Sequence, residues 1–225
     1  MCGRFSFHLT KEDVVELTGS FPDPYPPESY NQPPGEKICV LDAASQWASL
    51  PWGAEADIGP DRKSFVINAR SETAAEKKMF RSALKRRRCA VPASGFFEWK
   101  RAAQPSTPFY FAPQEGPGIL IAGIVLEVGD QAEARTVLLT READSWMKEI
   151  HHRAPAMIRP EKLDEWLNAE LPDHPLLDPF FYPGERGYLN RHPISDRVNR
   201  VKENDPSILN PVREPESFSQ GELFS

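Results

Sequence analysis

The chain has 225 residues, of which 40% are hydrophobic, so it is long enough to bury the core of one domain. It contains no apolar run of the roughly 18 residues that a membrane helix needs, and its N-terminus lacks the charged and apolar regions of a signal peptide. A net charge of −6 argues against a surface coated with cations, and cysteines at only positions 2, 39 and 89 argue against a disulfide framework and favour a cytoplasmic protein.

The first predicted element is a helix from Thr10 to Gly19. Thr10 is a suitable N-cap, acidic residues occupy the first turn, and Gly19 follows the end. Six prolines in residues 21–34 predict an irregular loop with neither helix nor central strand. Residues 37–41 and 46–50 then have the composition of two strands of a hairpin or meander.

Strands and helices alternate irregularly through the rest of the chain. Predicted helices cover residues 71–78 and 81–88, and further helical segments begin at Asp144 and Pro160. The predicted strands are 64–68, 89–92, 95–100, 108–112, 119–128, 134–140, 155–158 and 189–195.

This order of elements predicts an α+β fold. We expect a single domain over residues 1–202, with a mostly antiparallel, barrel-like β core and surrounding short helices. The polar, proline-containing stretch 203–225 is predicted to be a weakly ordered tail.

Basic residues are concentrated between Lys77 and Arg101. This stretch contains nine Lys and Arg but one acid, Glu98, so its charge is +8 and the remainder of the chain carries −14. A local basic face on an acidic protein is compatible with phosphate binding. A solvated helix face explains the same pattern equally well.

Cys2 becomes the N-terminal residue if Met1 is removed, and it then carries a thiol and an α-amine on adjacent carbons. The amine, with a pKa of about 7.7–8.0, is partly neutral at physiological pH. The thiol has an ordinary pKa of about 8.5, which cations or helix ends lower. Together the two groups condense with an aldehyde, first to an imine and then to a five-membered thiazolidine. The alternative is an ordinary cysteine in a frayed chain end.

Three further polar residues occupy unusual settings. Asn68 ends an apolar strand, Glu98 lies within an aromatic one, and His151 follows a short helix. Glu98 is either solvated or a carboxylate beside an apolar wall with a raised pKa, and a lone histidine is more often structural than catalytic. With Cys2, however, these residue types suit the formation of an imine and a ring. That chemistry needs a base, an acid and a neutral donor–acceptor for a ring-opened sugar.

Short segments carry a family resemblance that runs from residue 1 to about residue 200. They are Met1-Cys-Gly-Arg-Phe5, Tyr30-Asn-Gln-Pro-Pro34, Pro51-Trp-Gly53, Asn68-Ala-Arg-Ser-Glu-Thr73, Phe80-Arg81, Arg88-Cys-Ala-Val-Pro-Ala-Ser-Gly-Phe-Phe-Glu-Trp99, Leu139-Thr140, His151-His-Arg-Ala-Pro155 and Pro193-Ile-Ser-Asp-Arg-Val-Asn199. In this combination and order they resemble a SOS response-associated peptidase (SRAP) domain, the family of abasic-site processing proteins.

The resemblance implies a covalent sensor of abasic sites that acts in the DNA damage (SOS) response. Autoproteolytic removal of Met1 is implied to uncover Cys2, which then links to the ring-opened sugar as a thiazolidine. The implied activities are those of a thiol-dependent lyase and autopeptidase. In the family pattern Asn68 orients the sugar or the Cys2 amine. Glu98 acts in Met1 removal and proton transfer, and His151 assists ring opening and linkage.

The same resemblance implies how DNA is held. The matching positions are Arg4, Arg70 and Arg153 for phosphates and Trp52 for base stacking. Pro34, Arg81 and Thr140 match further DNA-binding positions. A cationic groove with aromatic platforms suits a single strand. The implied partners are single-stranded DNA containing abasic sites and, further, replication-fork proteins. The implied state is a nucleoid-associated monomer with no metal, cofactor or membrane contact.

Two departures from the family pattern concern packing and stacking. The family usually has Met where this chain has Ala154, and the smaller side chain is expected to loosen the packing that aims His151. It also tends to have a second Trp after Trp52, where residues 55–57 of this chain read Glu-Ala-Asp.

Two other functions stay open. Cys2 with His151 and Asn68 has the residue types of a cysteine-type peptidase acting on other proteins. A non-covalent reader of modified or single-stranded DNA, in which Cys2 is incidental, is the third hypothesis.

Overall fold

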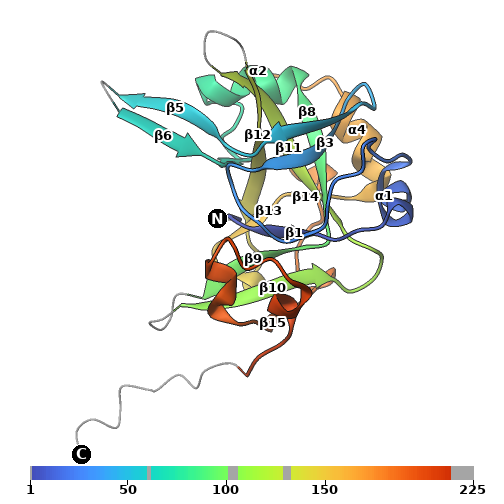
Figure 1. The fold of residues 1–225 in the computed structure, drawn as a ribbon. Helices are drawn as coiled ribbons and strands as arrows, with labels where there is room; N and C mark the ends of the chain where they lie inside the picture. The colour runs from blue at the N-terminus through green and yellow to red at the C-terminus, as the bar shows by residue number, and fades with distance from the viewer. Residues whose placement is uncertain (1, 60–61, 101–105, 129–132, 214–225) are drawn as a thin grey trace, which may run out of the picture.

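The structure of the protein, a computed structural model, describes residues 2–59, 62–100, 106–128 and 133–213. Its strands form three sheets, and the pairs are antiparallel except for one. Figure 1 shows the larger sheet in the upper part of the molecule, strands β9, β10 and β15 in the lower part, and the N-terminus between them. Within the described part of the chain, no helix is long and apolar enough to cross a membrane.

The larger sheet has eight strands, and it carries the residues on both sides of the candidate site. Its path runs β13-β12-β11-β8-β3-β4, with β14 paired to β11 and β7 paired in parallel to β12. The bounds are Lys37–Asp42 (β3), Trp47–Pro51 (β4), Asn68–Arg70 (β7), Arg88–Ala93 (β8), Ile119–Val128 (β11), Glu133–Glu142 (β12), Arg153–Pro155 (β13) and Met157–Ile158 (β14).

The smaller sheet contains the N-terminal strand at an inner position. Its order is β15-β10-β9-β1-β2, so β1 pairs with both β2 and β9. The bounds are Phe5–Phe7 (β1), Ser29–Gln32 (β2), Gly95–Lys100 (β9), Thr107–Pro113 (β10) and Leu189–Pro193 (β15). A separate two-stranded sheet joins Ala54–Gly59 (β5) to Arg62–Val66 (β6).

The helices are short and lie around the sheets (Figure 1). They are the α-helices Lys11–Thr18 (α1), Lys78–Arg86 (α2), Ser145–Lys148 (α3) and Leu163–Asn168 (α4), and the 3₁₀ helices Pro160–Lys162 (η1), Asp178–Phe180 (η2), Asp196–Asn199 (η3) and Pro206–Leu209 (η4). Buried aromatic side chains fill the core, among them Phe5, Phe96, Phe111, Trp52 and Trp166.

Local signals predicted several elements correctly. The Thr10 side chain accepts the backbone N–H of Asp13, whose carboxylate accepts that of Thr10, so a capping box begins α1. Gly19 ends the helix with φ of 79°, a conformation that favours glycine. The hairpin β3–β4 and the strands β8, β9, β11 and β15 also match their expected positions.

The expected helix over residues 71–78 is wrong. Residues 71–77 form turns and a bend, and Ser71 donates its backbone N–H to the Thr140 carbonyl at 2.8 Å, which ties the segment to β12. The following helix begins earlier than expected, at Lys78, and ends before Arg88 because Arg88 starts β8.

Two strand predictions also need correction. The proline-rich loop contains β2, because the stretch Ser29–Gln32 lacks proline and can pair with β1. The expected strand 64–68 is divided: β6 ends at Val66, and Asn68 opens β7, which pairs with β12 instead.

The expected barrel-like closure is not confirmed, because the described strands form open sheets with free ends. The segment expected to open a weakly ordered tail contributes η4 and a buried Ile208, and Pro211 pairs with Ile194 in an isolated bridge. The rest of that predicted tail, residues 214–225, lies outside the described residues.

The basic stretch contains a structural arginine. Arg88 is buried, and its guanidinium donates to Leu84 and Lys85 at the end of α2 and to the carbonyls of Trp166, Leu167 and Ala169 at the end of α4. It therefore satisfies the free carbonyls of two helix C-termini. Lys85 and Arg87 are paired with Asp173 and Glu127, so only part of the +8 segment is open to a ligand.

Candidate active site

Cys2 and Asn68 meet where β1 begins and β7 begins. The Asn68 amide nitrogen donates to the Cys2 carbonyl oxygen at 2.8 Å. The pairing of Asn68 with Leu138 in the parallel β7–β12 ladder fixes this position. The Asn68 Oδ1 atom is buried and has no hydrogen-bond partner, so it is available to accept from a ligand or an amine.

The Cys2 thiol is fully buried, and its sulfur lies 3.9 Å from the Arg4 carbonyl oxygen. Burial raises the pKa of the thiol far above its ordinary value, and the nearby Glu98 carboxylate raises this pKa further. The thiol is therefore neutral at physiological pH, and a thiolate would form only if another group accepts its proton.

Glu98 and His151 form the other half of the site. Glu98 lies in β9 opposite Phe109 and is 2% exposed, so the alternative that it is a solvated surface residue is wrong. His151 is also buried, and its Nδ1 atom lies 3.7 Å from Glu98 Oε1. That distance exceeds a hydrogen bond but makes an ion pair when the imidazole is protonated. The four predicted catalytic residues are thus brought together from the chain before β1, from β7 and β9, and from the chain after α3.

His151 is oriented by its own neighbours in sequence. Asp144 caps α3, and the His151 backbone N–H donates to the Met147 carbonyl at 2.9 Å. The backbone N–H of Arg153 donates to Nδ1 at 3.1 Å. The Arg153 carbonyl oxygen is 3.2 Å from the same atom, but a backbone N–H can only donate, so we assign Nδ1 as an acceptor. The neutral imidazole then carries its proton on Nε2.

The arginines expected to bind phosphates occupy different environments. Arg70 is exposed, and its guanidinium makes no hydrogen bond or ion pair with the described residues. Arg4 is half-buried and donates to Asn31 Oδ1 at 2.6 Å and to the Val198 carbonyl at 3.0 Å. Arg81 is exposed, and its guanidinium donates to the carbonyls of residues 75 and 76. It belongs to α2, which lies far from the lower sheet (Figure 1).

Arg153 is turned into the protein. It is 7% exposed, and its two terminal nitrogens each lie 2.8 Å from a carboxylate oxygen of Glu72. One of them also donates to the carbonyl and hydroxyl of Thr140, which is itself buried. Neither side chain is presented to a phosphate in this arrangement.

Trp52 is a core residue here. Its ring is fully buried, its Nε1 donates to the Ile67 carbonyl at 2.9 Å, and its centroid lies 5.3 Å from that of Phe5. The expected stacking on a base needs an exposed ring face, which this position does not offer. Pro34, the remaining expected contact, is partly exposed beside Gly35, which donates its N–H to the Trp52 carbonyl.

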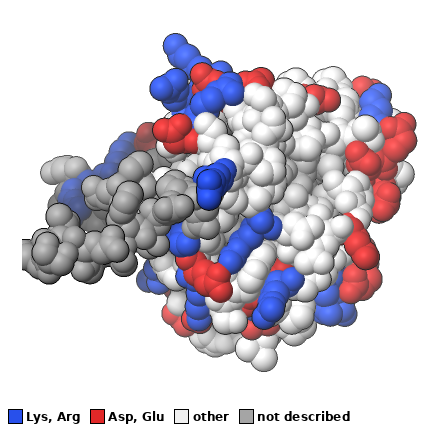
Figure 2. Space-filling view, turned by 90° about the horizontal axis from the view of Figure 1, so that it is seen from below, with Lys and Arg blue, Asp and Glu red and all other residues white. Residues whose placement is uncertain are grey.

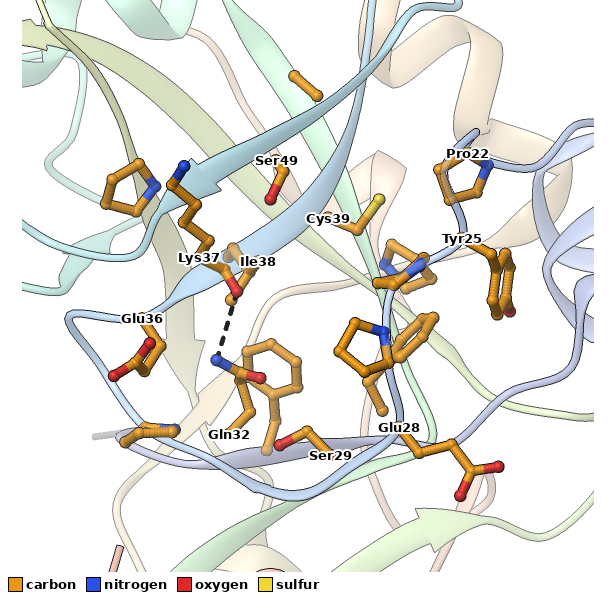
Figure 3. Close-up of a pocket in the computed structure, with 18 of the residues that line it drawn as sticks. Pro22, Tyr25, Glu28, Ser29, Gln32, Glu36, Lys37, Ile38, Cys39 and Ser49 are labelled. Atoms are coloured by element: carbon orange, nitrogen blue, oxygen red, sulfur yellow. Dashed lines mark hydrogen bonds between the residues drawn. The ribbon is translucent and has the colours of Figure 1, made fainter.

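A separate cavity of about 930 Å³ lies between the proline-rich segment, β2, β3 and β4 (Figure 3). Glu28, Glu36 and Lys37 are among its charged lining residues, and none of the four predicted catalytic residues lines it. Cys39 faces this cavity, and burial raises the pKa of its thiol to about 12. Cys39 therefore belongs to a different site from Cys2.

Charge on the lower face of the molecule is mixed. Figure 2 shows Lys and Arg side chains there lying among Asp and Glu and beside a wide uncharged area. Among the described residues, no cluster of three or more His, Cys, Asp or Glu side chains could hold a metal ion.

Comparison with known proteins identifies the family. The SOS response associated peptidase (SRAP) family matches residues 1–201. The chain belongs to the SRAP family. This SRAP chain is 32% identical to the abasic site processing protein YedK of Escherichia coli, over 94% of this chain and 100% of that protein. It is 30% identical to YoqW of Bacillus subtilis, over 93% and 99%, and 29% identical to HMCES of Pongo abelii, over 94% and 76%.

Solved structures support the fold of this SRAP chain. A phage-related protein from Bordetella bronchiseptica has a TM-score of 0.68 and 25% identity, over 87% of this chain and 95% of that one. A protein from Bacteroides thetaiotaomicron also has a TM-score of 0.68, at 21% identity, over 94% and 100%.

Two residues of the site were missed from the sequence of this SRAP chain. Glu72 binds Arg153, and Asn31 binds Arg4 while its amide nitrogen donates to the carbonyls of residues 198, 200 and 203. Both lie inside family segments quoted above, Asn68-Ala-Arg-Ser-Glu-Thr73 and Tyr30-Asn-Gln-Pro-Pro34. Their position within these segments could have indicated that the two residues matter. Their partners could not be predicted, because each partner lies far away in the sequence.

Proposed function

We propose that this protein captures abasic sites in single-stranded DNA by forming a covalent thiazolidine between Cys2 and the ring-opened sugar. The observation that carries the proposal is the meeting of Cys2 with Asn68 and Glu98. The amide holds the Cys2 carbonyl, and a buried carboxylate lies close enough to the thiol to raise its pKa. The Nδ1 atom of His151 lies 3.7 Å from an oxygen of that carboxylate.

The chemistry needs no oxidant, reductant or cofactor. The open form of an abasic sugar carries an aldehyde. The free α-amine of Cys2 adds to its carbon, and loss of water gives an imine. The thiol sulfur then bonds to the imine carbon while the thiol proton reaches the imine nitrogen, which closes the five-membered ring.

The buried residues are suited to these proton movements. Because the Cys2 thiol stays protonated, ring closure needs a neighbouring group that accepts its proton as the sulfur attacks. We assign that role, and proton transfer at the amine, to Glu98. We assign His151 to exchange protons with Glu98 and to assist sugar opening, which the distance of 3.7 Å between Nδ1 and Glu98 Oε1 supports. The unpartnered Asn68 Oδ1 suits an accepted hydrogen bond from the amine or a sugar hydroxyl.

The reaction requires that Met1 is removed, since an amide nitrogen does not form an imine. We propose that the chain's own peptidase activity removes it, with Glu98 taking part. We also propose that the protein acts in the DNA damage (SOS) response, as the description of its family suggests.

The names of the relatives agree with this proposal. YedK, YoqW and HMCES are each called abasic site processing proteins, and the regions matched cover nearly all of this chain. We assign the exposed Arg70, two residues after Asn68, to contact a phosphate beside the captured sugar.

The test is intact mass spectrometry of the purified protein before and after incubation with a single-stranded oligonucleotide carrying one abasic site. We expect a starting mass that lacks Met1, followed by a denaturant-stable gain of the oligonucleotide mass less one water. Cys2→Ser should abolish the stable adduct and leave weak DNA binding, because an imine can form but a thiazolidine cannot.

Two controls sharpen this test. Cys39→Ser should cross-link like the wild type, since Cys39 faces the separate cavity. An oligonucleotide whose abasic site lacks the aldehyde should give no adduct. A Cys2→Ser protein that cross-links equally well would contradict the proposal, and turnover of added peptides without any adduct would favour the peptidase hypothesis instead.

A further inference from the structure

Glu72 joins two parts of the site that are far apart in the sequence. Its carboxylate binds both terminal nitrogens of Arg153 at 2.8 Å, across a separation of 81 residues. Its Oε1 atom also accepts the backbone N–H of Glu142 at 2.8 Å, at the end of β12. Glu142 pairs with Arg153 in the β12–β13 ladder, so Glu72 binds both members of one ladder position.

The environment makes this a strong contact. The Arg153 side chain is 9% exposed, whereas that of Glu72 is 44% exposed. A bidentate arginine–carboxylate pair has fixed geometry and is stronger than a single charged hydrogen bond. Partial burial alone raises the pKa of Glu72, but hydrogen bonds and charge from Arg153, with backbone N–H groups, outweigh it and hold this pKa below its ordinary value. The carboxylate is therefore ionised at neutral pH.

Arg153 connects this ion pair to His151, because the same residue contacts both Glu72 and the imidazole. Its guanidinium is held by Glu72 and Thr140, while its backbone N–H donates to His151 Nδ1 at 3.1 Å. On the other side, Glu72 follows β7, whose first residue is Asn68. One ion pair thus connects the segment that holds Cys2 with the segment that orients the imidazole.

We propose that Glu72 is a positioning residue, whose ion pair with Arg153 sets the tautomer and place of His151 and thereby the rate of the cross-linking step. This inference rests on the proposed function. In this structure both terminal nitrogens of the Arg153 guanidinium contact Glu72 or Thr140. The alternative is that Glu72 occupies the place of a DNA phosphate and leaves Arg153 when DNA binds.

The variant that separates these two roles is Glu72→Gln. If Glu72 positions His151, the single-turnover rate at saturating DNA falls, on the order of tenfold to a hundredfold, because misplaced catalytic groups lose rate. The DNA concentration at half-saturation and its salt dependence stay unchanged. If Glu72 instead competes with phosphate, the variant binds DNA more tightly, and the slope of log affinity against log salt steepens by roughly 0.7.

Glu76→Gln is the matched control. Glu76 is exposed in the same turn segment, and its carboxylate makes no hydrogen bond or ion pair with the described residues. It therefore removes the same charge without touching Arg153, and we expect wild-type rate and affinity. Glu72→Asp keeps the charge but withdraws it by one methylene group, so its rate should lie between those of Glu72→Gln and the wild type.

A second readout does not depend on cross-linking. Nitrogen-15 NMR of the histidine side chains should show His151 with an unprotonated Nδ1 in the wild type and in Glu76→Gln, and a mixture of tautomers in Glu72→Gln. An unaltered His151 spectrum in Glu72→Gln would overturn the positioning role, as would a wild-type cross-linking rate. A wild-type protein that forms no adduct, but whose tautomer changes in Glu72→Gln, would reject the proposed function and keep the ion pair's role.

Discussion

At the scale of single residues, the site depends on a few hydrogen bonds that leave one atom open. Asn68 illustrates this, because its nitrogen holds the Cys2 carbonyl while its Oδ1 has no partner in a buried position. Burying an unsatisfied polar atom costs stability, so its presence next to Cys2 favours a ligand-binding role.

Asn68→Ala removes both functions at once. We expect the single-turnover cross-linking rate to fall by about tenfold or more, because the amine and sugar lose their fixed orientation. Stability should fall by only about 0.5–1.5 kcal/mol, the net value of one hydrogen bond. Quenched cross-linking assays and denaturant unfolding measure the two effects. Asn190→Ala, at an exposed position of β15, serves as the control, and equal rates for both variants would contradict the role of Asn68.

At the scale of elements, the close approach of β9 and β10 keeps Glu98 in place. Gly95 opens β9, and a Cβ atom there would lie 2.3 Å from the Phe111 carbonyl oxygen and 2.5 Å from the Tyr110 hydroxyl. That hydroxyl is hydrogen-bonded to Ser6 of β1 at 2.9 Å. A side chain at position 95 would therefore push apart three strands of the smaller sheet.

Gly95→Ala should destabilise the protein by about 1–3 kcal/mol, the usual cost of overpacking. Because β9 carries Glu98 and β1 follows Cys2, the cross-linking rate should also fall below that of the wild type at temperatures where the variant is folded. Thermal and denaturant unfolding provide the measurement. Gly187→Ala, where a Cβ would meet nothing within 4 Å, should leave stability nearly unchanged. Equal unfolding free energies for the two variants would refute the argument.

At the scale of the whole molecule, an acidic protein has to hold an anionic ligand. The net charge of −6 and the mixed charges of the described residues in Figure 2 show no broad positive potential that would attract DNA. Binding to DNA therefore has to depend on a few individual cations. Among the arginines implied to contact phosphates, Arg153 is occupied by Glu72 and Arg4 by Asn31 and Val198. Arg70 is the one whose guanidinium is exposed and has no partner among the described residues.

Arg70→Gln should therefore weaken binding to undamaged and abasic single strands alike. The slope of log affinity against log salt should become shallower by about 0.7, the value for one phosphate contact with a single strand. Fluorescence anisotropy titrations at several salt concentrations measure it. Arg186→Gln, at an exposed arginine in the loop before β15, should leave the slope unchanged. An unchanged slope in Arg70→Gln would show that this arginine does not contact a phosphate.

The sequence by itself determined what depends on neighbouring residues. The capped helix α1, the hairpin β3–β4 and the long strand β11 follow from caps, turns and periodicity within a few residues. The family also followed from the sequence, because its segments stand in order along the chain.

Only the tertiary structure decided which polar residues are buried together. The place of Glu98 beside His151, the pairing of Glu72 with Arg153 and the burial of Trp52 depend on strands that meet from distant parts of the chain. The helix expected at 71–78 failed for the same reason, since Ser71 binds the Thr140 carbonyl instead of starting a helix. Hydrogen bonds and burial between distant segments outweigh local propensities of a few tenths of a kcal/mol per residue, roughly. Local patterns cannot encode those partners.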